Sequence, residues 1–179
     1  TTDWKVPDPG VMLVKMSYGY RVRLAPIQMI TFYNAIANGG KMISPVLVRE
    51  LRRGDRVEER FESRTIASSI ASRAALREVQ QCLQAVCTEG TASAFFRDTT
   101  RLRVAAKTGT AQRGEGLVNN AMFILYAPYG DNPEIAIAIA VEKGGAGATL
   151  SPVARKIVDY YFTFQSSANT VENAYSLLK

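Results

Sequence analysis

The chain has 179 residues, 47% of them hydrophobic and 21% charged, so it can bury the core of one domain. Its formal net charge is +6, but the basic residues are scattered along the chain, and we expect no interface with nucleic acid. The sequence has no histidine, which excludes Ser-His-Asp triads and most zinc sites. Acid–base chemistry near neutral pH must therefore use lysine, carboxylate or tyrosine side chains. We expect no cofactor.

The N-terminal segment, residues 1–15, is predicted to be irregular because Pro7 and Pro9 fix the backbone and withhold hydrogen-bond donors. A helix is predicted from Pro26, a favourable first helical residue, to the Asn-Gly-Gly sequence at 38–40 that ends it. Apolar residues recur at helical spacing on one face of this helix: Met29, Phe32, Tyr33 and Ile36.

Residues 44–62 are predicted to form a hairpin at the periphery of the domain. Its strands would span residues 45–51 and 56–61, and Gly54-Asp55 would form the turn between them. The charged side chains that flank this turn indicate that the hairpin is exposed to solvent.

A second helix is predicted over residues 72–87, with Ser72 as its N-cap and a glycine beyond its end. Its apolar stripe consists of Leu76, Val79, Leu83 and Val86. Cys82 and Cys87 point to different faces of this helix, so we expect no disulfide between them. We interpret both cysteines as small buried apolar side chains.

Three strands are predicted in the second half of the chain, at residues 102–107, 120–127 and 134–142. The last alternates isoleucine or valine with alanine, so one face is bulky and the other allows a helix to approach closely. Because both faces are apolar, we expect a central strand that is covered on both sides. A tight Asp-Asn-Pro connection at 131–133 predicts antiparallel pairing with the strand before it.

The glycine-rich loop 144–147 leads to a third helix, in which Ser151 is the cap and Pro152 the first residue. The loop either lines a groove or is a plain flexible connection. The predicted buried face of the helix consists of Val153, Ile157, Tyr160, Tyr161 and Phe164. Residues 166–179 are predicted to be a tail with a short helix at about 170–178. Helices on a mainly antiparallel sheet define an α+β domain.

Residues 104–112 carry recognisable chemistry, because an apolar strand leads into a lysine, two threonines and a glycine. Alternation would place Lys107 and Gly109 on one face and the threonines on the other, unless twist or a bulge at Gly109 brings both sets to one groove. Gly109 allows another backbone to lie close, and Lys107 can hold an anion. Thr108 and Thr110 can donate hydrogen bonds to a carboxylate. These groups suit an extended peptide that ends in a carboxylate.

The same residues, read as Lys-Thr-Gly-Thr-Ala-Gln, resemble the third motif of penicillin-binding proteins. Other segments resemble the same family and follow its order: 17–20, 24–29, 32–41, 89–92, 126–129 and 132–134. The resemblance covers residues 16–162 and is closest to the monofunctional, class B type.

This resemblance implies a penicillin-binding/β-lactamase-like transpeptidase fold and a peptidoglycan D,D-transpeptidase activity. In that reaction a serine attacks a stem peptide ending in D-Ala-D-Ala, or a β-lactam antibiotic, and forms an acyl-serine intermediate. The resemblance implies that Lys107 sets the electrostatics of the site and relays a proton. The substrate-binding candidates are Lys107, Thr108, Gly109 and Thr110. Lys107 and Thr110 are the catalytic candidates, because the backbone N–H of Thr110 would donate to the oxyanion.

In this family the nucleophile belongs to a Ser-x-x-Lys motif and is followed by a Ser-x-Asn motif, both upstream of the third motif. We expect Ser-x-x-Lys nowhere in this chain, and Ser-x-Asn does not occur before Lys107. Ser167-Ala168-Asn169 spells the second, but it follows the third motif, and we interpret it as chance. We therefore expect residues 16–165 to be the C-terminal portion of a transpeptidase domain. A cloned fragment, a proteolytic product and one chain of a split protein are the alternatives, of which we favour a fragment.

The expected partners, by resemblance, are the stem peptide, β-lactams, the missing N-terminal half of the domain, and the machinery of cell-wall synthesis or division. The expected location is the extracytoplasmic face of the bacterial cytoplasmic membrane, with an absent N-terminal segment as the anchor. We expect this chain alone to be inactive. Two alternative functions remain open: a β-lactam sensor or β-lactamase, and a non-catalytic binding or scaffold module.

Overall fold

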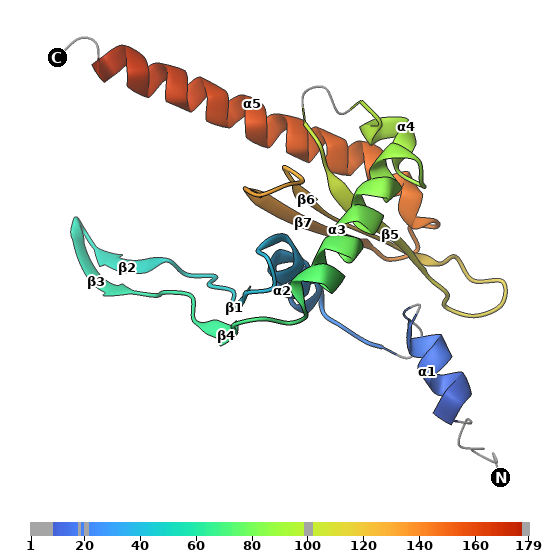
Figure 1. Cartoon of the computed structure of the whole chain (residues 1–179). Helices are drawn as coiled ribbons and strands as arrows, with labels where there is room; N and C mark the ends of the chain where they lie inside the picture. The colour runs from blue at the N-terminus through green and yellow to red at the C-terminus, as the bar shows by residue number, and fades with distance from the viewer. Residues whose placement is uncertain (1–8, 18, 20–21, 99–101, 177–179) are drawn as a thin grey trace.

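The computed structural model describes residues 9–17, 19, 22–98 and 102–176, and for 165–176 it describes the backbone only. Its centre is a three-stranded antiparallel sheet with helices on both faces (Figure 1). The strands, in spatial order, are β5 (Ala105–Ala111), β6 (Asn120–Ala127) and β7 (Ile135–Val141). The expectation of an α+β fold with a mainly antiparallel sheet is confirmed.

The central strand of this sheet is β6, not the alternating strand expected there. β7 pairs only with β6 among the described residues, so it lies at an edge of the sheet. Its two faces are apolar because the helix α2 covers the alanine face at Ala136, while Ile137 faces the core beneath the helix α5. Burial on both faces reports which layers cover a strand and carries no information on its lateral neighbours.

Two helices cover one face and one edge of the sheet. α2 (Pro26–Ala37) begins at a proline, and its preceding backbone N–H at Ala25 donates to the Gln28 side chain at 2.8 Å. α3 (Arg73–Thr88) packs beside β5 and is capped by Ser72, whose Oγ accepts from the backbone N–H of Ala75 at 3.2 Å. Both helices were expected at these positions.

The packing of α3 differs in detail from its predicted stripe. Leu76, Leu83 and Cys87 are buried, whereas Val79 is 43% exposed and Cys82 is also exposed. The prediction that both cysteines are buried is therefore wrong for Cys82. The helix contacts β5 along a narrow face, so residues at its margins stay in contact with solvent.

The long C-terminal helix, α5 (Ser151–Ser176), differs from the sequence expectation in two ways. It continues through residues 166–169, where we expected an interruption before a separate short helix; the sequence has no glycine or proline there to break it. Its buried residues are Ser151, Ala154 and Val158. Most of the predicted buried stripe is instead exposed: Val153, Ile157, Tyr160 and Phe164. Small side chains at the contact let the helix lie close on the sheet, which turns the larger ones outward.

A second correction concerns the N-terminal segment, where α1 (Pro9–Ser17) is helical rather than irregular. Pro9 occupies the first helical position, where the missing N–H has no consequence, and the Val-Met-Leu-Val run that follows propagates the helix. None of its residues is buried. The expectation for residues 1–8 lies outside the described residues.

The predicted peripheral hairpin is present as the outer part of an arm. β2 (Glu50–Arg53) and β3 (Arg56–Arg60) pair antiparallel around Gly54, which has a φ of 61°. At the base of the arm, β1 (Met42–Ile43) pairs with β4 (Thr65–Ala67). The hairpin extends away from the sheet (Figure 1).

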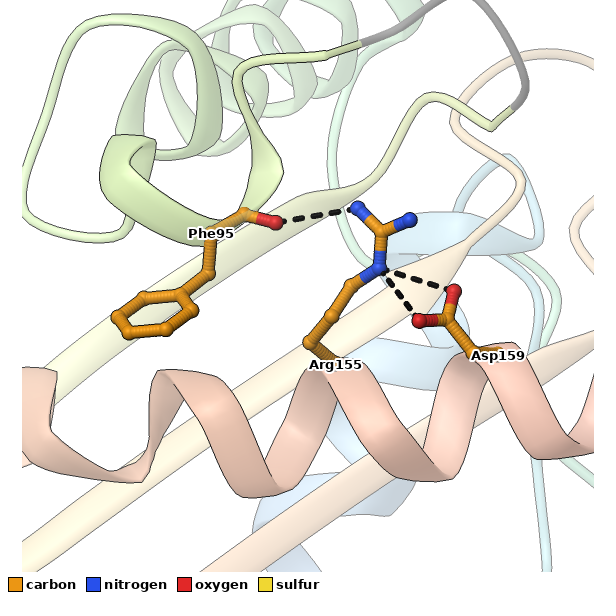
Figure 2. A network of polar contacts seen from close by, with 3 residues as sticks. All are labelled: Phe95, Arg155 and Asp159. Atoms are coloured by element: carbon orange, nitrogen blue, oxygen red, sulfur yellow. Dashed lines mark hydrogen bonds and ion pairs between the residues drawn. The ribbon is translucent and has the colours of Figure 1, made fainter.

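The short helix α4 (Ser93–Phe96) connects α3 to the layer formed by α5. Figure 2 shows that Arg155 of α5 links this helix to α4, because its Nη1 donates to the backbone oxygen of Phe95 at 3.1 Å. The Nε of Arg155 donates to both carboxylate oxygens of Asp159 at 2.9 Å. The guanidinium also lies over the Phe96 ring, 5.9 Å from its centroid. Within the part of the chain that the structure describes, no helix combines the length and apolarity needed to cross a bilayer.

Candidate active site

The Lys-Thr-Gly segment lies inside β5 rather than at the end of a strand. The predicted strand, residues 102–107, is displaced toward the C-terminus, because β5 continues through the motif to Ala111. It pairs with β6 in unbroken register, from Ala105 opposite Tyr126 to Ala111 opposite Asn120. No bulge occurs at Gly109, so the four motif residues keep the alternation of an ordinary strand.

The side chain of Lys107 lies on the exposed part of β5. Its Nζ donates to the backbone oxygen of Thr108 at 2.6 Å, which folds the lysine back along its own strand. Among the described residues it makes no ion pair with a carboxylate. Its charge is therefore available to an anion that approaches this surface.

The hydroxyls of the two motif threonines each contact a residue from outside the motif. Thr108 Oγ1 lies 2.9 Å from Oγ1 of Thr91, in the turn that follows α3. Thr110 Oγ1 accepts a hydrogen bond from the backbone N–H of Gly147 at 3.1 Å. Sequence reasoning named both threonines as substrate-binding candidates but did not predict these two partners. The signal for Thr91 was present only as part of the resemblance at 89–92.

The glycine-rich loop 144–147 packs against the motif strand through Gly147, a role that neither of the two sequence alternatives described. It leads into the short 3-10 helix η1 (Gly147–Leu150), and Gly147 lies against the backbone of Gly109. A Cβ at Gly147 would lie 2.3 Å from the Gly109 oxygen and 2.5 Å from the Met122 oxygen. Only glycine permits this backbone-to-backbone contact.

The titratable groups buried behind the motif are poor candidates for acid–base chemistry. Burial raises the pKa of the Cys87 thiol from 9.0 to about 12. Burial also raises the pKa of the Tyr126 and Tyr33 phenols, and for Tyr126 the neighbouring Tyr129 and Cys87 add to the effect. All three groups therefore stay neutral near pH 7. Tyr18 and Tyr20, in the segment 17–20 that carries part of the resemblance, lie outside the described residues.

No cluster of three or more His, Cys, Asp or Glu side chains that could hold a metal ion occurs in the described ranges. The expectation that Ser-x-x-Lys occurs nowhere in the chain is wrong, because residues 176–179 spell it, beyond the motif strand. α5 ends at Ser176, and residues 177–179 lie outside the described residues. Its position after the Lys-Thr-Gly motif reverses the order found in penicillin-binding proteins.

Comparison with known families identifies the class of protein. The model of the penicillin-binding protein transpeptidase domain matches residues 5–159, which is most of the chain. The chain therefore belongs to the penicillin-binding protein transpeptidase family.

Individual relatives agree with this assignment. Peptidoglycan D,D-transpeptidase MrdA of Salmonella typhimurium is 33% identical over 180 positions, covering 90% of this chain and 28% of the relative. A ceftriaxone acyl-enzyme complex of penicillin-binding protein A from M. tuberculosis has a TM-score of 0.72 at 24% identity, covering 87% of this chain and 36% of that one. PBP2 of Pseudomonas aeruginosa in complex with WCK 5153 has a TM-score of 0.61 at 28% identity, covering 77% and 29% respectively. The chain thus spans only 28% of the length of MrdA.

Proposed function

We propose that this chain forms the Lys-Thr-Gly wall of the active site of a peptidoglycan D,D-transpeptidase, which cross-links stem peptides through an acyl-serine intermediate. The observation that carries the proposal is the arrangement on β5. Within four consecutive residues it presents two hydroxyls with fixed partners and a lysine that makes no ion pair with any described residue. Those groups match a ligand that presents an extended backbone and a carboxylate.

In the proposed reaction, Lys107 attracts the substrate and assists proton transfer, while Thr108 and Thr110 donate to the terminal carboxylate of the peptide or the matching carboxylate of a β-lactam. The backbone N–H of Thr110 donates to the oxyanion. The nucleophilic serine, its lysine base and the second motif come from a part of the protein outside these residues. Removal of a single oxyanion donor commonly slows such reactions by about 10²–10³, so this wall alone has little activity.

The proposal extends to location and partners. The intact protein works at the extracytoplasmic face of the bacterial cytoplasmic membrane, together with the machinery of wall synthesis or division. The names of its relatives support the partners of this proposal and not the location: MrdA of Salmonella typhimurium is a peptidoglycan D,D-transpeptidase, and penicillin-binding protein A of M. tuberculosis forms a ceftriaxone acyl-enzyme complex.

The test is the rate of acylation by a labelled penicillin in the intact protein that carries this chain. Lys107→Ala should lower that rate by about 10²-fold or more, because the mutant loses the cation that faces the bound anion. Lys156→Ala is the matched control, since Lys156 is an exposed lysine on α5, away from the motif. The control should react at the normal rate, and circular dichroism should show an intact fold in both variants.

Two results would contradict the proposal. Normal acylation of a folded Lys107→Ala protein would show that the lysine is only structural. Stoichiometric labelling of the isolated 179 residues would show that the nucleophile is one of their own hydroxyls. Ser176→Ala would then establish whether the Ser-x-x-Lys spelling at the C-terminus is responsible.

A further inference from the structure

Thr91 is the residue outside the motif whose side chain contacts a motif hydroxyl. It follows α3 in a turn held by backbone hydrogen bonds, from Gly90 N to Ala85 O at 2.8 Å and from Ala92 N to Val86 O at 3.1 Å. Ala92 is fully buried. The turn therefore holds the Thr91 side chain at a fixed place beside β5, and its Oγ1 lies 2.9 Å from Oγ1 of Thr108.

The direction of this hydrogen bond decides what Thr108 can do. A hydroxyl carries one proton and two acceptor lone pairs, and an ionised carboxylate can only accept. Thr108 can donate to a carboxylate only if its own proton is not already donated to Thr91. In that arrangement Thr91 is the donor and Thr108 the acceptor, a direction that the hydroxyl–hydroxyl contact allows.

Thr110 provides an independent precedent on the same strand. Its Oγ1 accepts from the backbone N–H of Gly147, which has no ability to accept in return. The Thr110 proton therefore remains available to a ligand. If Thr91 is the donor, each motif hydroxyl accepts one hydrogen bond from the protein, Thr108 from Thr91 and Thr110 from Gly147. Each hydroxyl then keeps its own proton for the ligand.

We propose that Thr91 is a positioning residue for carboxylate recognition, because it donates to Thr108 and so directs the Thr108 proton to the bound anion. This proposal rests on the proposed function, since it assumes that the motif binds a carboxylate. The effect belongs to ligands with a free carboxylate, because an ester offers a weaker acceptor at the same place. It should also disappear when Thr108 has no hydroxyl.

The experiment measures the second-order rate constant of acylation of the intact protein by a penicillin and by its methyl ester. Thr91→Val removes the hydroxyl and keeps the branched shape, while Thr91→Ser keeps the hydroxyl and serves as the matched control. We expect Thr91→Val to slow the free acid by about tenfold, the value of one lost hydrogen bond, and to change the ester rate less than about twofold. Thr91→Ser should restore the preference for the free acid.

A double-mutant cycle with Thr108→Val gives the second measurement. If Thr91 acts through Thr108, Thr91→Val should add no further loss to Thr108→Val. Equal slowing of acid and ester, additive losses in the cycle, or no slowing at all would each overturn the proposal. Failure of the unmodified protein to react with either compound would instead refute the proposed function, and this proposal with it.

Discussion

At the scale of single residues, Gly147 shows how close the support behind the motif is. Any Cβ there would overlap the backbone oxygens of Gly109 and Met122, at 2.3 and 2.5 Å, and neither backbone can move without disturbing the β5–β6 pairing. Gly145, two residues earlier, has a φ of 80°, and a Cβ added there would have no neighbouring atom within 4 Å. Glycine is therefore required at Gly147 because a side chain would not fit, and it is favoured at Gly145 because the backbone has a positive φ.

We predict that Gly147→Ala will destabilise the protein by about 3 kcal/mol, near the upper end for overpacking, because backbone must move. Gly145→Ala should cost about 1 kcal/mol, since it introduces only the left-handed strain. Denaturant unfolding measures both values, and penicillin acylation of the intact protein should be slowed by Gly147→Ala alone. Equal effects of the two substitutions would show that the contact with Gly109 has no special role.

The candidate residues of the site could be selected from the sequence, but the residues that contact them could not be predicted. Lys107, Thr108 and Thr110 are adjacent, so a local motif was enough to select them. Thr91 and Gly147 contact the same strand from segments that precede and follow it in the sequence. Thr91 lies in the turn after α3, and Gly147 lies in the loop after β7. Such contacts depend on tertiary packing, which no local pattern encodes.

At the scale of elements, the two cysteines of α3 report which face of this helix is exposed to solvent. Cys87 is fully buried, Cys82 is exposed, and both are free. Burial raises the pKa of Cys87 to about 12, so its reactive thiolate is scarce even in alkaline solution. The raised pKa contributes stability below pH 9.0, its ordinary value, and that contribution is lost as the pH rises toward 12.

We predict that a thiol reagent will modify Cys82 rapidly in the folded chain and Cys87 only on unfolding. Cys82→Ser should abolish the fast phase and leave one thiol that reacts in denaturant. Stopped-flow absorbance at pH 8 measures both phases. Similar native rates for the two thiols would contradict the orientation of α3 described above.

Element positions followed from sequence where caps and breakers mark them. Pro26 and Ser72 begin α2 and α3 as predicted, and β6 has its predicted bounds. Two of the errors fall where no such marker exists, whereas α1 was missed although Pro9 marks its start. Residues 166–169 have a polar composition typical of a linker, but they contain no helix breaker and α5 continues through them. Gly109 is a residue type common in turns, but it pairs with Met122 inside β5. Tertiary contacts override weak local preferences at such places.

At the scale of the whole molecule, the described residues leave three kinds of surface without a partner. The outer edge of β5 pairs with no strand in the described part of the chain, although α3 packs beside this strand. α2 exposes Ile27 and Phe32 at 43% and 47%. α5 exposes an apolar stripe at helical spacing: Val153, Ile157, Tyr160 and Phe164. Unpaired strand edges and contiguous apolar patches both promote association.

We therefore predict that the isolated chain self-associates, through β5, through α2, or through the α5 stripe, which the sequence had assigned to the core. Sedimentation at rising concentration should show species heavier than the 19.6 kDa monomer. Phe32→Lys and Tyr160→Lys place a charge on α2 and α5 respectively, and the variant that weakens association identifies the contact; if neither does, the edge of β5 remains. Lys156→Ala, at an exposed position of α5 beside the stripe, removes no apolar side chain and is the control. A monomer at every concentration would show that these surfaces tolerate water, and it would favour a complete small scaffold module over one wall of a larger active site.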